Sequence, residues 1–353
     1  MHIYYRKKLT RFISLVLSTV IFLIGCGTSK TSSSTSEPLT RQNFVLGTIV
    51  SISLYDHQSE ETLDAAFKKL SELENILSVN KTNTLIDEIN AKAGIEPVKV
   101  DEATYNLIKK GIYYSQLTSG AFDVTVGPIV KLWNIGFPNA RVPSQTEIDE
   151  KLPLVDYNFV TLDDSNQTVY LQKKGMLLDL GGIGKGYAAD EVADLLRKAG
   201  VEHAIINLGG NIYALGDKPV GKPWGIGIQD PFNPRGATIG TLGVTNKSVV
   251  TSGIYERYLE AEDGTKYHHI LNPDTGYPYT NEIAGVTIVS DSSTDGDALS
   301  TSTFALGIEE GLKFIEGLDG IDAIFITTDK KVYITSGIKE NFKITNTAFE
   351  QIN

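Results

Sequence analysis

Cysteine, histidine and positive charge are scarce in this sequence of 353 residues. Its single cysteine, Cys26, excludes a disulfide within one chain, so the fold must be stable without cross-links. Lys and Arg number 32 against 43 Asp and Glu, a net charge of −11, which argues against nucleic acid as a partner. The sequence also lacks an internal repeat and a second low-complexity linker, which favours one large domain.

Residues 1–25 have the pattern of a secretory leader. Four basic residues precede an apolar run, Phe12–Ile24, that is too short to span a bilayer comfortably. The letters LIGC at residues 23–26 resemble the bacterial lipobox, in which the cysteine is lipidated and becomes the new N-terminus. We therefore expect a lipoprotein signal peptide over 1–25, lipidation of Cys26, and a lipid anchor on the extracytoplasmic face of the cell membrane.

The next segment, residues 26–38, is almost wholly small and polar, which predicts a flexible Ser/Thr-rich linker after the lipidated Cys26. From residue 39 the composition is globular, and we expect one catalytic domain over 39–353. The leader holds four of the 32 basic residues and no acids, which leaves 28 against 43, or −15. Anionic headgroups repel such a chain, so the lipid, and not charge, would hold it at the membrane.

Strand-like and helix-like segments follow one another irregularly in this domain. The alternating run Phe44–Tyr55 predicts one strand, and leucines at helical spacing predict a helix over Glu60–Val79. Further helices are predicted over Glu102–Leu117 and Tyr187–Ala199, the latter closed by Gly200. Many strands in hairpin-like succession with few helices favour an α+β fold over a doubly wound sheet.

The stretch DLGGIGKGYAAD, residues 179–190, places four glycines around Lys185 between a predicted strand and a predicted helix. Free N–H groups and the helix dipole suit anions there, and glycines let the backbone approach a ligand. A P-loop is excluded because Gly186 stands where Ser or Thr is needed. The dinucleotide-binding pattern fits residues 184–189, but Asn207 replaces the expected acid. It remains an alternative, as does a turn that only packs the helix on the sheet.

Six motifs occur in one order along the chain. They are GAFDVTVGP (120–128), DLGGIGKGYAAD (179–190), INLGGN (206–211), TSGIYER (251–257), YHHILNPDTGYP (267–278) and GDALSTSTFALG (296–307). Together they resemble the FAD:protein FMN transferase family, also called ApbE. The resemblance covers nearly everything from Phe44 onward.

This resemblance implies an enzyme that cleaves the pyrophosphate of FAD, releases AMP and attaches FMN through a phosphoester to Thr or Ser of another protein. The anions cradled by residues 179–190 would then be the phosphates of FAD. It also implies a single ApbE-like, T-fold-like catalytic domain with mostly antiparallel mixed sheets flanked by helices. For a tethered enzyme, we expect extracytoplasmic or membrane electron-transfer proteins with a Thr/Ser flavinylation motif as acceptors.

Phosphoryl transfer requires charge neutralisation and positioning, so we expect a divalent metal, Mg²⁺ or Mn²⁺. Asp297 and Thr301 lie four residues apart on a predicted helix and share one face. A carboxylate, a hydroxyl and a carbonyl, with water and pyrophosphate oxygens, suit Mg²⁺. The resemblance places that carbonyl at Gly182. The alternative is that Asp297 and Thr301 only cap the helix.

Lys185 suits a cation beside the phosphates, and the resemblance implies FAD contact for both Lys185 and Asp179. The alternative for Asp179 is a capping acid for the following turn.

The resemblance also brings three residues of the first motif, Ala121, Phe122 and Asp123, to the flavin or ribose. It lays the backbone at Leu271 against FAD. Phe122 taken alone is more often a core residue. Leu46 stands at the expected flavin pocket where the family often has Met, which leaves the packing of the isoalloxazine ring open.

Two adjacent histidines, His268 and His269, precede a turn-rich segment. A histidine can act as the general base on an acceptor hydroxyl. The resemblance gives that role to the residue directly before Ile270, so we predict His269 as the catalytic base, with Lys185 beside it. Otherwise both are satisfied loop histidines.

Other functions stay open at this stage. A lipoprotein that binds FAD without catalysis and an FAD pyrophosphatase share the same ligand, whereas an oxidoreductase would use the GxGxxA turn for a nicotinamide dinucleotide. Release of AMP, transfer of FMN and turnover of nicotinamide distinguish them.

Overall fold

The computed structural model describes residues 37–79 and 81–353. Every described residue belongs to one compact unit. The expected signal peptide, Cys26 and nearly all of the linker lie outside the described residues. Within them, none of the helices has the length and hydropathy that a membrane span requires.

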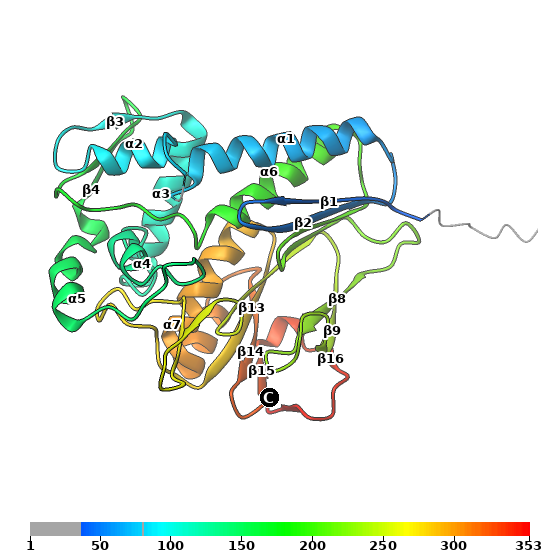
Figure 1. Ribbon diagram of the computed structural model, residues 1–353. Coiled ribbons are helices and arrows are strands. Elements are labelled where there is room, and N and C mark those ends of the chain that lie inside the picture. Colours follow the sequence, from blue (N-terminus) through cyan, green and yellow to red (C-terminus); the bar gives the residue numbers. More distant parts are fainter. Residues whose placement is uncertain (1–36, 80) are drawn as a thin grey trace, which may run out of the picture. The chain divides into compact units, whose positions relative to one another are not determined.

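A nine-stranded sheet carries the fold (Figure 1). Its strand order is β1-β2-β6-β7-β10-β13-β14-β15-β17, and only the last pair, β15 with β17, is parallel. The strands are β1 (Leu39–Val45), β2 (Thr48–Leu54), β6 (Ala204–Leu208), β7 (Asn211–Leu215), β10 (Lys247–Gly253), β13 (Ile283–Ser290), β14 (Asp322–Thr327), β15 (Lys331–Ile334) and β17 (Glu350–Gln351).

Both faces of this sheet are covered, which explains why all eight residues of β13 are buried. One face packs against α7 (Ser293–Glu316), which contacts β10 and β13. Against the other face lies a three-stranded sheet, and Ile226, Leu242 and Val289 belong to the core between them. That small sheet is β16-β9-β8, formed by β8 (Trp224–Gln229), β9 (Thr238–Val244) and β16 (Phe342–Ile344).

Helix α6 (Gly184–Lys198) packs against α7, β7 and α1 (Glu60–Leu77). In α1, leucines and Phe67 at spacings of three and four are buried, as an amphipathic helix requires. The remaining helices are α2 (Leu85–Ala91), α3 (Glu102–Leu117), α4 (Gly127–Trp133) and α5 (Gln145–Lys151). The remaining strands are β3 (Val98–Lys99), β4 (Val160–Asp163), β5 (Thr168–Leu171), β11 (Tyr258–Glu260) and β12 (Lys266–His268).

The predicted α+β fold with mostly antiparallel sheets is confirmed. The single strand predicted over Phe44–Tyr55 is wrong, because the backbone reverses at Leu46 and Gly47 to form the β1–β2 hairpin. Both residues have positive φ, 56° and 67°, and Leu carried no sequence signal for a turn. The dinucleotide-binding alternative is also wrong, because the strand after α6, β6, pairs only with antiparallel neighbours.

Candidate active site

Helix α6 begins inside the glycine-rich stretch, at Gly184, three residues earlier than predicted. Its N-cap, Ile183, has no side chain that can accept a hydrogen bond. Among the seven α-helices of the described residues, only α6 and the short α4 lack a side-chain cap. The first N–H groups of a helix carry partial positive charge. The α6 N-terminus is therefore suited to an anion.

Asp297 supplies the missing cap from another helix. Its Oδ2 accepts a hydrogen bond of 2.8 Å from the N–H of Gly186, and its Oδ1 lies 3.5 Å from Nζ of Lys185. The side chain is buried, and it lies in the second turn of α7, whose own cap is Ser292. The alternative that Asp297 caps its own helix is therefore wrong.

Gly186 allows this contact because α6 and α7 touch at this point. A Cβ at Gly186 would lie 2.1 Å from the carbonyl oxygen of Ser293 and 2.7 Å from Cβ of Asp297. Asp190, one turn along α6, accepts hydrogen bonds from the backbone N–H groups of Ser293 and Thr294 at 2.7 and 2.9 Å. The two helix N-termini are thus held together.

Thr301 follows Asp297 by one turn on α7 and lies beside Gly182. A Cβ at Gly182 would meet Phe122 at 2.9 Å and Oγ1 of Thr301 at 3.6 Å, so only glycine leaves this space open. Oγ of Ser252 lies 3.4 Å from Oγ1 of Thr301. The structure therefore brings the three predicted metal ligands, Gly182, Asp297 and Thr301, to one place.

The donor set fits a hard divalent cation. The buried carboxylate of Asp297 has only one N–H donor and one distant ammonium as partners among the described residues, which leaves oxygen lone pairs available. A hydroxyl oxygen stands next to it, and Mg²⁺ prefers oxygen ligands.

The two adjacent histidines have different surroundings. Nε2–H of His268 donates to the carbonyl of Tyr279 at 2.8 Å, and its Nδ1 accepts from the N–H of Ile270 at 3.2 Å. Both nitrogens are satisfied, and burial lowers the pKa of His268. This histidine therefore holds the loop.

Among the residues that the structure describes, the ring of His269 has one hydrogen-bond partner, the carbonyl of Arg257, to which Nδ1 donates at 3.2 Å. Nε2 then carries the free lone pair. Burial, with the positive charges of Arg257 and Lys185, lowers the pKa of His269 to about 4. The imidazole is neutral at pH 7 and able to accept a proton, so the geometry favours His269 as the base.

Asp179 forms a local turn. Its N–H donates to the carbonyl of Val124 at 2.8 Å, and its Oδ1 accepts from the N–H of Gly181 at 2.7 Å. Burial raises the pKa of this carboxyl, with Lys131 acting against the rise. The side chain of Asp179 therefore caps the following turn, and a contact of Asp179 with FAD stays a prediction.

The first motif forms the loop before α4. Both carboxylate oxygens of Asp123 accept hydrogen bonds, from Thr125 at 2.7 Å and from the N–H of Tyr157 at 3.0 Å, so this side chain holds the loop. Phe122 is buried against Gly182. The carbonyl of Ala121 accepts from the hydroxyl of Tyr279 at 3.1 Å. The loop thus borders Gly182.

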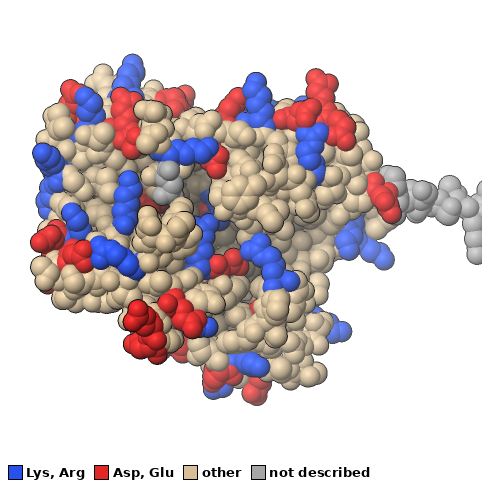
Figure 2. Space-filling model, in the orientation of Figure 1, with Lys and Arg blue, Asp and Glu red and all other residues tan. Residues whose placement is uncertain are grey.

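Leu46 and Leu271 approach from two other elements. Leu46 stands at the β1–β2 turn and is partly buried. Leu271 is buried beside Trp133, and its backbone bridges to Pro278. In the orientation of Figure 1, the turn at Leu46 points toward the beginnings of α6 and α7, and Figure 2 shows a hollow in this part of the surface bordered by charged side chains.

Two residues of the TSGIYER motif were given no role by sequence reasoning. Ser252 contacts Thr301, and the carbonyl of Arg257 accepts from both N–H and Nδ1 of His269, at 3.1 and 3.2 Å. The TSGIYER motif was recognised in the sequence as one of the six motifs. The sequence could not show that its residues reach α7 and the histidine loop.

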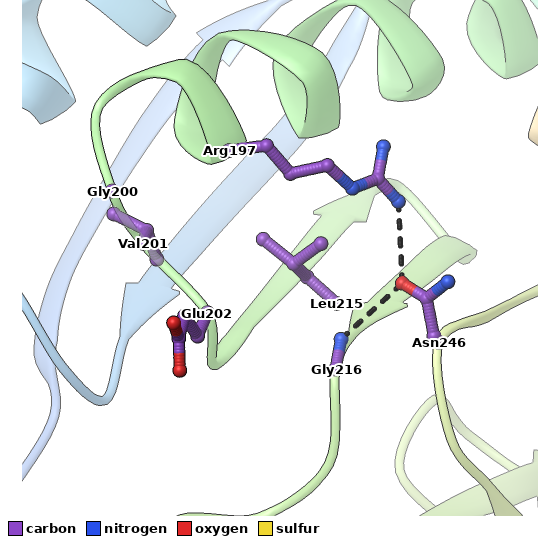
Figure 3. Close-up of a pocket in the computed structure, with 7 residues that line it drawn as sticks. All are labelled: Arg197, Gly200, Val201, Glu202, Leu215, Gly216 and Asn246. Atoms are coloured by element: carbon purple, nitrogen blue, oxygen red, sulfur yellow. Dashed lines mark hydrogen bonds between the residues drawn. The ribbon is translucent and has the colours of Figure 1, made fainter.

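A separate cavity of about 320 Å³ lies at the other end of α6, and no predicted site residue lines it (Figure 3). There Arg197 reaches toward Asn246, which also accepts from the N–H of Gly216. Nearby, Asp56, Glu202 and His203 offer ligand atoms within 4.8 Å of one another. Asp56, however, accepts from the N–H groups of Glu202 and His203 and so joins the strand ends.

Comparisons with known proteins find relatives over most of the chain. The model of the ApbE family matches residues 46–325. An FAD:protein FMN transferase of Klebsiella pneumoniae is 40% identical over 88% of this chain and 95% of its own length. The crystal structure of the ApbE protein from Thermotoga maritima superposes with a TM-score of 0.79 at 34% identity, over 86% of this chain and 99% of that one. The flavin transferase ApbE from Vibrio cholerae gives 0.77 at 29% identity, over the same shares. The chain therefore belongs to the ApbE family.

Proposed function

We propose that this protein is a Mg²⁺-dependent FAD:protein FMN transferase that attaches FMN by a phosphoester to Thr or Ser of an acceptor protein and releases AMP. The observation that carries the proposal is the contact of Asp297 with both Lys185 and Gly186 at the N-terminus of α6, whose own N-cap residue, Ile183, offers no capping side chain. It joins an anion site to a divalent-cation site, as transfer from a pyrophosphate requires. The family relationship, with relatives named for this activity, supports it.

The residues of the chain would divide the work. The α6 N-terminus and Lys185 bind the pyrophosphate, and Gly182, Asp297 and Thr301 hold the cation. When bound, Mg²⁺ neutralises charge on the pyrophosphate oxygens. The acceptor hydroxyl attacks the phosphorus of the FMN half, the bond to the AMP phosphate breaks, and Nε2 of His269 takes the hydroxyl proton.

The low pKa of His269 fits this role once the substrate is counted. Burial and two cations lower it to about 4 in the free protein. Bound phosphates place negative charge beside the imidazole, which favours its protonated form and raises the pKa. The base is thus stronger in the complex than in the free enzyme.

The location of the enzyme is part of the proposal. The predicted signal peptide and Cys26 would place it on the extracytoplasmic face of the cell membrane, held by lipid. Its acceptors would then be extracytoplasmic or membrane electron-transfer proteins. Labelling of cells with a clickable fatty acid, followed by capture of the protein, tests this, with Cys26→Ala as the unlabelled control.

The activity is tested by incubating the protein from about residue 37 onward with FAD, Mg²⁺ and an acceptor that carries a Thr/Ser flavinylation motif. Intact mass spectrometry of the acceptor should show a gain of one FMN minus water, with AMP in solution. EDTA and Asp297→Ala should each abolish the gain. FMN and AMP appearing without a modified acceptor would indicate a pyrophosphatase, and FAD bound but unchanged would indicate a binding protein.

A further inference from the structure

Arg257 differs from every other arginine in residues 37–79 and 81–353. The other four each pair with a carboxylate: Arg41 with Glu60 and Asp64, Arg141 with Glu147, Arg197 with Asp194, and Arg235 with Glu256. The guanidinium of Arg257 has neither an ion pair nor a hydrogen bond to any described residue. In a chain with 43 acidic and 32 basic residues, a carboxylate partner is easily supplied, so its lack points to another anion.

The Arg257 side chain lies along the edge of the active site. A Cβ at Gly136 would lie 3.0 Å from its Cδ, and a Cβ at Gly47 would lie 4.0 Å from its Nη2. The guanidinium therefore sits against the β1–β2 turn that carries Leu46. Both neighbours are glycines, so neither adds a side chain of its own beside Arg257.

The same residue is tied to the proposed base. Its carbonyl accepts both the N–H and Nδ1–H of His269, at 3.1 and 3.2 Å. The charge of the guanidinium acts on the imidazole together with that of Lys185. Two cations thus lie near His269, but only Lys185 has a carboxylate, Asp297, within reach.

We propose that the Arg257 guanidinium binds a phosphate of the FAD pyrophosphate on the hairpin side of His269, as a second cation beside Lys185. The planar fork of arginine matches two phosphate oxygens, which fixes orientation as well as position. The carbonyl of Arg257 holds His269 by hydrogen bonds. A phosphate bound by the guanidinium of the same residue therefore has a fixed position relative to the base. The proposal rests on FAD being the substrate.

Binding of three ligands that share the flavin ring tests the proposal. Riboflavin has no phosphate, FMN has one and FAD has two, and titration calorimetry gives the affinity of each without requiring transfer. Arg257→Ala should weaken FMN and FAD by about tenfold to a hundredfold, the range of a charged hydrogen bond, and leave riboflavin unchanged. Arg257→Lys should recover part of the loss.

Arg235→Ala is the matched control, since Arg235 is exposed, nearby in sequence and paired with Glu256 at 3.0 Å. It should bind all three ligands like the unmodified protein, and thermal melts should show that each variant is folded. Equal affinities of Arg257→Ala and the unmodified protein for FMN and FAD would overturn the proposal. So would an equal loss for riboflavin, which would make Arg257 part of the flavin pocket, or an unmodified protein that does not favour FMN over riboflavin. Normal binding without FMN transfer would instead sink the proposed function alone.

Discussion

The two ends of helix α6 differ in how completely their polar groups are used. At the C-terminus, Arg197 bonds to Asp194, Tyr213 and Asn246, and Gly200 ends the helix with φ of 84°. At the N-terminus there is no side-chain cap, and the one carboxylate that reaches it comes from α7. Both ends carry glycine and a basic residue.

The two ends of α6 therefore differ in purpose: the C-terminal end stabilises the fold, and the N-terminal end is available to bind a ligand. A saturated helix end contributes to folding, because its carbonyls and charges have partners in the native state. At the N-terminus, the N–H of Gly184 donates to the carbonyl of Leu180 at 2.7 Å and that of Gly186 donates to Asp297, so among the described residues the N–H and the ammonium of Lys185 are the groups left for an anion. The cavity in Figure 3 is therefore a poorer candidate site than the α6 N-terminus.

The largest effect should follow from removing the base near the N-terminal end. We expect His269→Ala to lower FMN transfer by about a hundredfold to ten-thousandfold, the range of general base catalysis, while FAD still binds. Stopped assays followed by mass spectrometry measure the rate. His268→Ala should instead lower the melting temperature, because two hydrogen bonds of the loop are lost. If His269→Ala transfers FMN as fast as the unmodified protein, His269 is not the general base.

The pH profile sharpens the same assignment. Since the pKa of His269 is lowered to about 4, the free enzyme keeps a neutral imidazole above that pH. We expect kcat/KM to fall as pH drops through about 4, and kcat to fall at a higher pH because bound phosphates raise the pKa. Measurement of both from about pH 3 to 8 in the proposed assay checks this. Identical midpoints would contradict the phosphate effect.

A matched pair of glycines compares the ends directly. Gly186→Ala should push α6 away from α7, because its Cβ would lie 2.1 Å from the carbonyl oxygen of Ser293. A shift of about 1 Å at a phosphate site can cost about a hundredfold in rate. Gly200→Ala should cost about 1 kcal/mol from the left-handed backbone and leave transfer unchanged. Equal losses of transfer in both variants would break the comparison.

Arg197→Ala removes a positively charged, hydrogen-bonded side chain from the C-terminal end of α6. It removes hydrogen bonds to Asp194, Tyr213 and Asn246, and we expect a loss of about 1 kcal/mol in the free energy of unfolding, discounted for the exposure of Arg197. Urea unfolding measures the loss. Transfer at saturating FAD should match that of the unmodified protein, and a slower rate would show that this end communicates with the site.

The smallest effect concerns the hairpin beside the N-terminal end. Leu46 has φ of 56° in a two-residue turn that favours Asn, so Leu46→Asn should raise the free energy of unfolding by about 0.5–1 kcal/mol. If Leu46 packs on the flavin, as the family resemblance implies, FAD affinity should fall at the same time. A variant that gains stability and keeps its affinity for FAD would place the flavin elsewhere.

The helices whose ends depend on a local pattern could be predicted from the sequence. Helix α3 follows its prediction to the residue, and α1 begins at Glu60 as predicted and ends two residues earlier, at Leu77. Helix α5 was not predicted, although Ser144 and Glu147 form a capping box that the sequence shows.

Contacts across long distances in the sequence were out of reach of local patterns. The spacing of Asp297 and Thr301 indicated a shared face, but the cap that Asp297 gives to Gly186 depends on how α6 and α7 cross. Likewise, two adjacent histidines in one loop look alike in sequence. Their roles can be told apart only in the structure, where His268 bonds to the carbonyl of Tyr279 and His269 bonds to the carbonyl of Arg257.

The site draws on segments that run from Leu46 to Thr301 and meet only in the finished fold, so an unfolded chain cannot bind FAD with comparable affinity. Ligand binding confined to the native state stabilises it by mass action, by about 2.7 kcal/mol at a hundredfold excess over Kd. The lifetime of the enzyme against heat and proteases should therefore rise with the FAD concentration around it. A shortage of FAD would reduce the amount of enzyme as well as its rate.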